Sequence, residues 1–500
     1  MRLTLSSPTR AYVSQATDEE LISLRDQLSY VDLSIKHEIK RLSKNHWFRS
    51  SNPEKYELTI KLLKEKLNCC LVFEDGPLLY IRPGSIPYLE NLTLEIDDQI
   101  KYPKTKKIPW VKPIPYELYP YQKQSVEKLI EVKHGNVSIT TGGGKSNILL
   151  SLCRETGLRT AIVAPSKAIF NELVRTFEYH LGKGNIGKFG DGKKKLDKKI
   201  TICIGDSLCN VTPNSKEWEF FSSLEMLCVD ESHTWGSESL EQICNGIFSE
   251  IPYRFFMSAT QTRNDGGIRL LQSIIGKTVH SLTTREAVDG GYICKHDYRI
   301  VKIEVSDPNL TSDDPLTIKR ELFLRNRNIG TFIAKLANAM GAKGEQVLIL
   351  VEELGQIAML NKLITVPFGY AHSETKKERL VELGLEKVDV QEQIDRFNRN
   401  EIKALAGTAA IHVGCNIFPM TITVNWVGGA SEIKTRQAAI GRSIRLPQAN
   451  PYSAKCGKKE LVTIFDFDIQ GNFVLERHLE SRVACYMDSG DNLIKYIRLK

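Results

Sequence analysis

Two series of short apolar runs constrain the fold of this chain most strongly. Within each series, runs rich in Val, Ile and Leu alternate with stretches of helical periodicity. Short β-branched runs separated by helices are typical of parallel sheets that are buried on both faces. The runs lie at 160–164, 200–204, 226–229 and 254–257, and then at 346–351, 368–371, 402–406, 422–427 and 461–465. The chain is therefore predicted to be an α/β protein with two doubly wound parallel-sheet domains.

The first hundred residues have a different pattern. Charged helical stretches alternate there with short apolar runs, which predicts a small α+β domain. Residues 101–120 then contain five Lys and five Pro but no Asp, so they are predicted to form an extended, exposed connector. The predicted parts are 1–107 (leading accessory domain that contacts the DNA substrate), 108–293 (first motor domain), 294–470 (second motor domain) and 471–500 (helical tail).

The overall composition excludes several classes of protein. No apolar run approaches the ~20 residues that a membrane span needs, and the N-terminus lacks the apolar centre of a signal peptide. We therefore expect a cytoplasmic protein with no membrane partner. Eleven Cys residues include no Cys-x-x-Cys pair, so neither a disulfide framework nor a zinc site is indicated. The formal charge of +8 favours polyanionic partners without identifying one.

A glycine-rich turn precedes the first series. Three glycines, 142–144, separate the apolar run 137–139 from Lys145 and Ser146. A strand that turns through glycines into a helix points several backbone N–H groups at one spot, which suits a phosphate. Lys145 would then bridge the β- and γ-phosphates and Ser146 would hold Mg²⁺. Ile139 stands where the strict pattern has Gly, so a glycine turn without a ligand is the alternative. The predicted nucleotide-binding residues here are Thr141, Gly142, Gly143, Gly144, Lys145 and Ser146.

A second chemical signal is an apolar strand that ends in two acids, Asp230 and Glu231. Ligands of doubly wound folds bind at the carboxyl ends of the strands, where these carboxylates would lie. Asp230 would hold Mg²⁺, and Glu231 would polarise the water that attacks the γ-phosphate. An ordinary helix N-cap is the alternative explanation. The pair lies 85 residues after Lys145, and this position favours the catalytic explanation over the N-cap.

Together these boxes resemble those of the superfamily 2 helicases, whose series of motifs is matched across residues 115–446. Asp-Glu-Ser-His at 230–233 fits their Asp-Glu-x-His box, so the resemblance implies a catalytic role for His233. Tyr119-Pro120-Tyr121-Gln122 is similar to the adenine-reading Q motif, with Gln122 on the base edge. The resemblance implies two RecA-like motor domains, with ATP and Mg²⁺ as cofactors.

Further boxes of the same resemblance imply contacts with nucleic acid and coupling of hydrolysis to movement. Ser-Ala-Thr at 258–260 is similar to the coupling box, which comprises Ser258, Ala259 and Thr260. For His372, a satisfied surface His is the alternative. The residues implied to contact nucleic acid are Pro165, Ser166, Lys167, Gly205, Asp206, Ser207, Arg263, His372 and Thr408.

The last box, 437–445, matches Gln-x-x-Gly-Arg-x-x-Arg of motif VI, which implies catalytic roles for Gln437, Arg442 and Arg445. Arginines three residues apart lie on one face of a helix, from which they could neutralise charge on a departing phosphate. A solvated basic helix face is the alternative.

The compact core and short leading domain look most like phage DNA helicases of the UvsW type, which are related to RecG and XPB-like translocases. This resemblance implies an ATP-dependent DNA helicase that acts as a monomer. It would unwind or branch-migrate forks and Holliday junctions in phage replication, recombination and repair, with proteins of replication or recombination as partners. An RNA-dependent ATPase is one alternative. An ATP-gated clamp that binds junctions without separating strands is another.

Three basic segments are candidates for contacts outside the motor. Residues 182–199 have seven Lys and two acids, and residues 101–112 have five Lys and none. Either segment could contact DNA or form a solvated loop. Trp47, Phe48 and Arg49 could stack on bases or wedge a junction, with a core Trp as the alternative.

Overall fold

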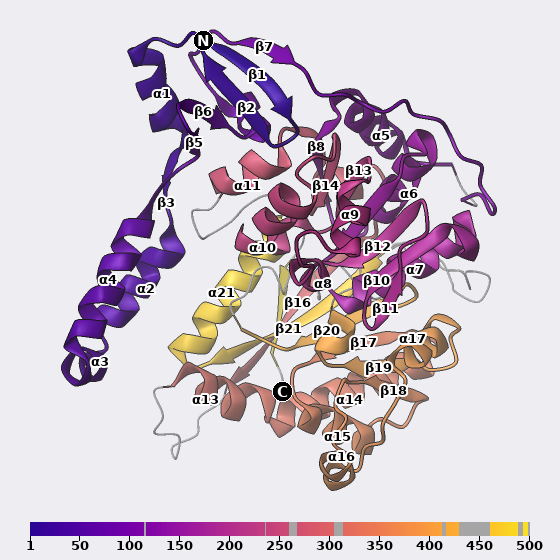
Figure 1. The fold of residues 1–500 in the computed structure, drawn as a ribbon. Helices are drawn as coiled ribbons and strands as arrows, with labels where there is room; N and C mark the ends of the chain where they lie inside the picture. Colours follow the sequence, from indigo (N-terminus) through magenta and orange to yellow (C-terminus); the bar gives the residue numbers. More distant parts are fainter. Residues whose placement is uncertain are drawn as a thin grey trace. The chain divides into compact units, whose positions relative to one another are not determined.

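The chain folds into two units, each of which contains a parallel sheet (Figure 1). The computed structural model describes residues 1–114, 117–235, 237–259, 268–304, 314–412, 417–429, 461–488 and 494–498, without the side chains of His233, Ser237, Glu238, His412 and Asp488. One unit comprises Met1–Ile139 and Gly144–Ser281, and the other comprises Thr140–Gly143 and Leu282–Lys500. In the described part of the chain, no helix combines the length and apolar character needed to cross a membrane.

A five-stranded sheet of order β5-β6-β2-β1-β7 organises the described part of the leading domain. Its strands are β1 (Arg2–Ser7), β2 (Arg10–Ser14), β5 (Val72–Asp75), β6 (Leu78–Ile81) and β7 (Glu95–Asp98). Helix α1 (Asp18–Leu28) begins at a capping box between Thr17 and Glu20, and it buries Leu24 and Leu28 in the core of this domain.

A helical hairpin extends away from this sheet (Figure 1). It comprises α2 (Leu33–Ser43), α3 (His46–Ser51) and α4 (Pro53–Leu67), with the short strands β3 (Ser29–Val31) and β4 (Asn68–Cys70) paired at its base. Helices α1 and α2 are thus separated by strand β3. None of the three hairpin helices has a fully buried residue, so the hairpin adds little to the core.

Residues 101–114 and 117–119 of the connector form neither helix nor strand, as its prolines predict, but several of them are hydrogen-bonded to the first motor domain. The backbone N–H groups of Lys106 and Ile108 donate to the carbonyls of Thr156 and Arg154, at 2.8 and 2.9 Å. The N–H of Val111 donates to the carbonyl of His180 at 2.9 Å. A short helix, η1 (Pro83–Tyr88), precedes it in the sequence. The segment therefore lies along the motor domain as a strap.

The sheet of the first motor domain has the order β11-β10-β12-β9-β13-β14-β8-β15 in the described residues. From β10 to β8 all the neighbouring pairs are parallel. The strands are β8 (His134–Ile139), β9 (Thr160–Ala164), β10 (Ile186–Gly190), β11 (Lys193–Lys195), β12 (Ile200–Ile204), β13 (Met226–Val229), β14 (Tyr253–Ser258) and β15 (Thr278–Leu282). Its helices include α5 (Pro120–Val132), α6 (Lys145–Thr156), α7 (Lys167–Leu181), α8 (Gly205–Cys209), α9 (Lys216–Ser222), α10 (Ser237–Glu241) and α11 (Ile268–Ile275).

The second sheet has the order β18-β19-β17-β20-β21-β16-β22 in the described residues, and its neighbouring strands are parallel. The strands are β16 (Lys295–Glu304), β17 (Val347–Val351), β18 (Phe368–Ala371), β19 (Ala404–Gly407), β20 (Ile422–Trp426), β21 (Leu461–Gln470) and β22 (Ile494–Arg498). Its helices include α12 (Thr284–Asp289), α13 (Pro315–Lys319), α14 (Arg327–Ala342), α15 (Leu354–Leu363), α16 (Lys377–Leu383), α17 (Val390–Asn398), α18 (Ala409–His412) and α21 (Phe473–Asp488). Two buried parallel sheets confirm the predicted α/β class.

The C-terminal tail differs from its prediction. Residues 471–500 were expected to be helical, and α21 fulfils this for Phe473–Asp488. The described residues after it, however, form strand β22, which pairs in parallel with β16 along Tyr298–Lys302. A five-residue strand at a sheet edge that includes two charged residues, Lys495 and Arg498, gives too weak an apolar pattern to be recognised from the sequence.

Candidate active site

The boxes of the first motor domain lie along one edge of its sheet. Because the carboxyl ends of parallel strands meet at the same edge, the residues that follow β8, β14 and β13 are neighbours in that order. These residues belong to the glycine turn, the coupling box and the acidic box. Strands β9 and β12 continue the edge and are followed by the two strand-contacting boxes. The topology therefore brings the predicted nucleotide site next to the predicted nucleic-acid site.

The glycine turn has the backbone that its composition requires. Gly142 and Gly144 have φ angles of +82° and +74°, a region that residues with a Cβ rarely adopt. The N–H of Gly143 donates to the carbonyl of Thr140 at 3.0 Å, and the N–H of Thr140 donates to the carbonyl of Leu282. Helix α6 begins immediately after the turn, at Lys145. The turn thus leads directly into a helix N-terminus that can receive an anion.

Gln122, the predicted adenine-reading residue, packs against this turn. A Cβ built on Gly144 would collide with the side-chain amide of Gln122. The Oε1 atom of Gln122 accepts a hydrogen bond from the backbone N–H of Tyr119 at 3.1 Å. The rings of Tyr119 and Tyr121 are stacked 5.8 Å apart. Gln122 of the resembled Q motif therefore packs closely against Gly144, the last glycine of the turn.

Lys145 is buried and is held by two oxygens. Its Nζ lies 3.2 Å from Oε1 of Glu231 and 3.3 Å from the carbonyl oxygen of Ile139. Glu231 has a φ of +48°, which is strained for a residue other than Gly. Such strain often marks functional positions. Lys145 and Glu231, the predicted phosphate ligand and the predicted catalytic carboxylate, therefore form an ion pair with each other.

Asp230 lies beside this pair and is also buried. Burial, and then the charge of Glu231, raise the pKa of Asp230 to about 7, while Lys145 opposes the shift. The N–H of Glu231 donates to Oδ1 of Asp230 at 2.9 Å. A buried carboxylate whose pKa is raised in this way has a strong tendency to accept a cation, because the cation would restore its ionised form.

Trp235 links the acidic box to a strand-contacting box. Its Nε1 donates to the carbonyl of Asp230 at 3.2 Å, and its ring lies so close to Gly205 that any Cβ there would collide with it. Ser232 also donates to the carbonyl of Met257 on β14, at 3.2 Å. The Trp235 contact could not be recognised from the sequence, because a Trp two residues beyond the box is equally typical of a core position.

The strand-contacting residues lie around the turn between β10 and β11. Ser166 is the N-cap of α7, and the exposed Lys167 forms an ion pair with Asp191 at 2.6 Å. A Cβ on Gly190 would lie 3.0 Å from Oγ of Ser207. Pro165, Gly205 and Asp206 flank these residues at the ends of β9 and β12. Elsewhere in the segment 182–199, ion pairs engage several of the lysines, namely Lys188–Glu178, Lys193–Asp191, Lys194–Glu217 and Lys198–Asp197.

In the second unit, His372 and Thr408 follow the adjacent strands β18 and β19. The N–H of Thr408 donates to the carbonyl of Ala371 at 3.1 Å. His372 is only 3% exposed, and its Nε2 hydrogen-bonds the carbonyl of Glu386 at 3.0 Å. Because the ring of His372 is buried, it offers no exposed face to nucleic acid in this structure, and the contact stays a prediction.

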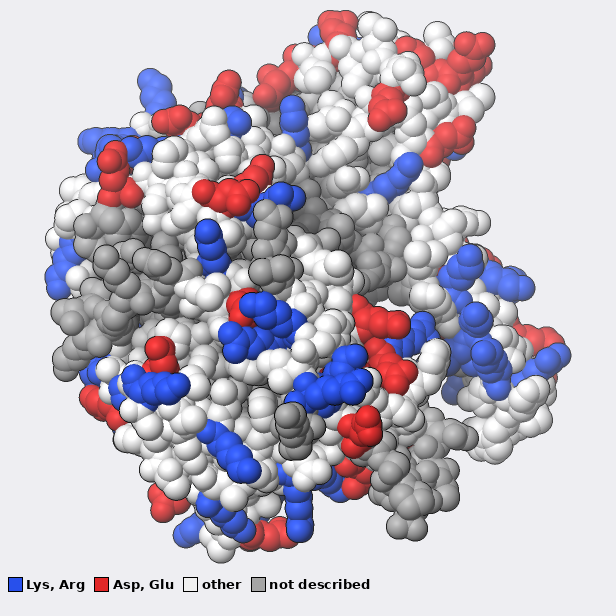
Figure 2. Space-filling view, turned by 180° about the vertical axis from the view of Figure 1, so that it is seen from behind, with Lys and Arg blue, Asp and Glu red and all other residues white. Residues whose placement is uncertain are grey.

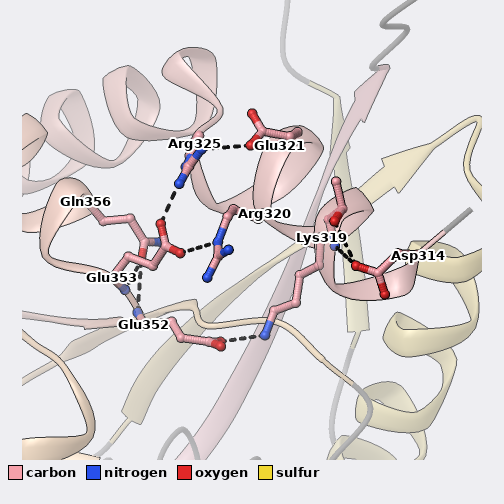
Figure 3. Close-up of polar contacts among 9 residues, drawn as sticks. Asp314, Lys319, Arg320, Glu321, Arg325, Glu352, Glu353 and Gln356 are labelled. Carbon is pink, nitrogen blue, oxygen red and sulfur yellow. Dashed lines mark hydrogen bonds and ion pairs between the residues drawn. The ribbon is translucent and has the colours of Figure 1, made fainter. Parts of the chain in front are cut away.

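A cluster of ion pairs fixes the carboxyl end of β17 (Figure 3). Glu353 accepts from Nε of Arg320 at 2.5 Å and lies 3.5 Å from Nε of Arg325. Lys319 pairs with Glu352 at 2.5 Å, and Oε1 of Gln356 accepts from the N–H groups of both glutamates. Most of these side chains are partly exposed, so the cluster positions the start of α15 and contributes little stability.

A buried polar network, which the sequence did not indicate, joins β20, β21 and α21. Both oxygens of Asp466 accept from Arg482, at 2.7 and 3.0 Å, and Oδ2 also accepts from Tyr486 at 2.6 Å. Asn425 donates to Oδ2 at 3.2 Å, and Nη1 of Arg482 donates to the carbonyl of Gly429 at 2.8 Å. Arg482 therefore holds the last described residue before the segment that contains the predicted motif VI.

Of the coupling box, Ser258 ends β14 beside Ser138 of β8, and Ala259 follows it. Several predicted residues lie outside the described ones: Thr260, Arg263, Gln437, Arg442 and Arg445. The backbone of His233 lies in a short helix, η3 (Ser232–Thr234), directly after the two acids.

The fold and the order of these boxes are similar to those of the superfamily 2 helicases, which are ATP-dependent enzymes. Residues 115–263 match the family described as type III restriction enzyme, res subunit. The DNA 3'-5' translocase XPB2 of Sulfurisphaera tokodaii is 24% identical over 356 residues, which cover 66% of this chain and 79% of that protein.

Solved structures of similar fold include a fragment of a putative HsdR subunit of a type I restriction enzyme from Vibrio vulnificus. It has a TM-score of 0.53 at 16% identity, covering 78% of this chain and 70% of that one. T4 UvsW has a TM-score of 0.43 at 15% identity, covering 100% of this chain and 99% of that one.

Proposed function

We propose that this protein uses ATP hydrolysis to move along branched DNA and to remodel forks and four-way junctions in phage replication, recombination and repair. The chain is a DNA helicase of superfamily 2. The observation that carries the proposal is the single sheet edge that presents the glycine turn, the acidic box and two strand-contacting boxes in succession. The match to a relative named as a DNA translocase supports DNA as the track.

In this proposal the turn from Thr141 to Ser146 binds the phosphates of ATP, and Gln122 contacts the adenine. Asp230 and Ser146 hold Mg²⁺, which would neutralise charge on the phosphates. The raised pKa of buried Asp230 fits a cation. No group of three or more His, Cys, Asp or Glu in the described chain could bind a metal unaided. This fits Mg²⁺, which keeps phosphate and water ligands.

Glu231 accepts the proton of the attacking water in this proposal, and Lys145 leaves Glu231 to bind the phosphates. A carboxylate that is released from an ion pair at that moment is a stronger base for the step. His233, Gln437, Arg442 and Arg445 are assigned to the sensing of the γ-phosphate by the resemblance of their boxes. The grip on the backbone comes from the boxes after β9 and β12, so it should tolerate any sequence and weaken with salt.

The test is strand displacement and ATP turnover by the full chain on a panel of synthetic forks, flaps, four-way junctions, single strands and RNA. The proposal expects ATP-dependent displacement on branched DNA, and turnover stimulated more by branched DNA than by RNA. Stimulation by RNA alone would identify an RNA-dependent ATPase instead. Tight junction binding without displacement would identify a clamp.

A further inference from the structure

The tip of the helical hairpin presents a large aromatic side chain to solvent. Trp47 is 74% exposed, although it is the type of residue that folding normally covers. The tip is held in place by contacts within the hairpin. Asn45 caps α3 through the N–H of Phe48 at 3.0 Å, and Phe48 packs edge-on against Tyr56 of α4 at 5.8 Å. The neighbouring ring thus supports the hairpin, while Trp47 is presented outward.

A ladder of positive charge leads along α2 to this tip. Lys36, Lys40 and Lys44 are four residues apart, so they lie on one face of the helix as close neighbours. All three are exposed, and no acidic side chain forms an ion pair with any of them in the described structure. Like charges at this spacing destabilise a helix. A polyanion bound along this face of α2 would neutralise them.

The other long helix of the hairpin shows the contrasting pattern. Along α4, Glu57, Lys61 and Glu65 are also spaced by four, but their charges alternate. Alternating signs are typical of an ordinary solvated helix face. The excess of positive charge therefore belongs to α2 and the tip, where residues 33–52 contain five Lys and Arg and one Glu.

The surface view shows a further contrast in charge, between the two ends of the leading domain (Figure 2). In Figure 2 the Lys and Arg side chains gather on the hairpin, at the right of the view, whereas Asp and Glu side chains gather on the end of the leading domain that carries α1. Because the two ends of one small domain have opposite charge, a polyanion would be directed to the hairpin.

We propose that the hairpin tip is a second nucleic-acid site, at which Trp47 stacks on an unpaired base and the lysines of α2 contact the adjoining phosphates. An exposed aromatic ring beside a basic track is the arrangement that binds single strands without sequence preference. A base inside a duplex has no free face to offer, so the site takes an unpaired nucleotide, such as one beside a fork junction. The inference rests on the proposed function, because it identifies an unpaired nucleotide as a part of the DNA substrate that this motor binds.

The test measures binding by the full chain without ATP, so that motor activity does not contribute. A forked DNA carries 2-aminopurine at an unpaired position next to the junction, and both its fluorescence and its anisotropy are recorded. The site predicts that the protein quenches the fluorescence, that Trp47→Ala removes the quenching and weakens fork binding about tenfold, and that Trp47→Phe restores much of both. Phe473→Ala is the matched control, because Phe473 is 75% exposed on α21.

The lysine ladder is tested in the same assay. Lys40→Glu should weaken binding. It should also make the negative slope of log K against log salt shallower by about 0.7 for each lost phosphate contact with a single strand. Lys61→Glu on α4 makes the same charge change and should leave both unchanged.

Wild-type fork affinity and quenching in Trp47→Ala would overturn the inference, as would equal effects of Lys40→Glu and Lys61→Glu. Circular dichroism checks that each variant is folded. The hairpin site and the motor can fail independently. If wild-type protein binds forks in a Trp47-dependent way but shows no DNA-stimulated ATP turnover, the motor proposal alone is refuted.

Discussion

The Nζ atom of Lys145 lies 3.2 Å from the carboxylate of Glu231, so the predicted phosphate ligand and the predicted base neutralise one another. Both groups are mostly buried, so separating them without another partner would leave uncompensated buried charges. A triphosphate at the glycine turn would compete with Glu231 for the ammonium group. ATP binding would thereby release the carboxylate at the place where the attacking water is needed.

Glu231→Gln should separate binding from hydrolysis. The amide keeps the size of the side chain but cannot accept the proton of water, so ATP turnover should fall by about 10²–10⁴-fold. Nucleotide affinity should be retained or increase, because Lys145 loses a competing partner. Single-turnover hydrolysis and equilibrium binding of labelled ATP measure the two quantities. Equal loss of both would show that Glu231 has only a structural role.

Gly144→Ala should disturb the nucleotide site. A Cβ at this position would collide with Gln122, and the φ of +74° adds about 1–2 kcal/mol of strain for a residue other than Gly. We expect ATP binding at least tenfold weaker, measured by calorimetry. Gly184→Ala is the matched control, since no atom lies within 4 Å of a Cβ there. An unaffected Gly144→Ala variant would contradict the close packing of the Q motif on the turn.

The stability of the first unit should fall in acid because of His134. Burial, with a further contribution from the charge of Arg254, lowers the pKa of this His from 6.5 to about 4. The unfolded chain therefore binds a proton that the folded chain rejects, so the stability is complete above pH 6.5 and is lost as the pH falls toward 4. The expected loss between pH 7 and pH 5 is about 2 kcal/mol.

Urea unfolding at the two pH values measures this loss. His134→Gln should make the difference between them smaller by that amount, because its amide can still donate to the carbonyl of Ile274 but does not titrate. A pH dependence that is the same in the variant would assign the effect to other groups.

Arg482→Ala should destabilise the second unit by about 3–5 kcal/mol, because it leaves the fully buried Asp466 without its cation. Thermal or urea unfolding measures this loss. The double variant Arg482→Met with Asp466→Leu should recover much of the stability, since it removes both charges. If the single variant unfolds like wild type, the network is not the anchor of α21 that its geometry indicates.

The fold class could be predicted from the sequence because its signal is local. Buried parallel strands such as β9, β12 and β17 are continuous apolar runs, and each appears in the sequence close to its observed position. Strand β22 could not be recognised, because it is short and two of its five residues, Lys495 and Arg498, are charged. The connector was predicted to be extended, but its hydrogen bonds to Thr156, Arg154 and His180 depend on partners distant in the sequence.

The candidate site also combines features that a local sequence pattern predicts with contacts that it does not. Glycine turns and paired acids have fixed spacing, so Lys145, Asp230 and Glu231 were recognisable, and the structure brings them together. The contact of Trp235 with Gly205 and the bond of Arg482 to Asp466 join residues whose partners no local pattern specifies. Such contacts arise from the topology of the sheet, and only a three-dimensional arrangement reveals them.

ATP turnover of the full chain with and without forked DNA, in wild type and in Lys145→Ala, shows whether the glycine turn drives a DNA motor by hydrolysing ATP. We expect DNA-stimulated turnover in wild type. In the variant we expect loss of that turnover by at least about 10²-fold, with fork binding largely intact. Turnover in Lys145→Ala equal to that of wild type would contradict this role of the glycine turn.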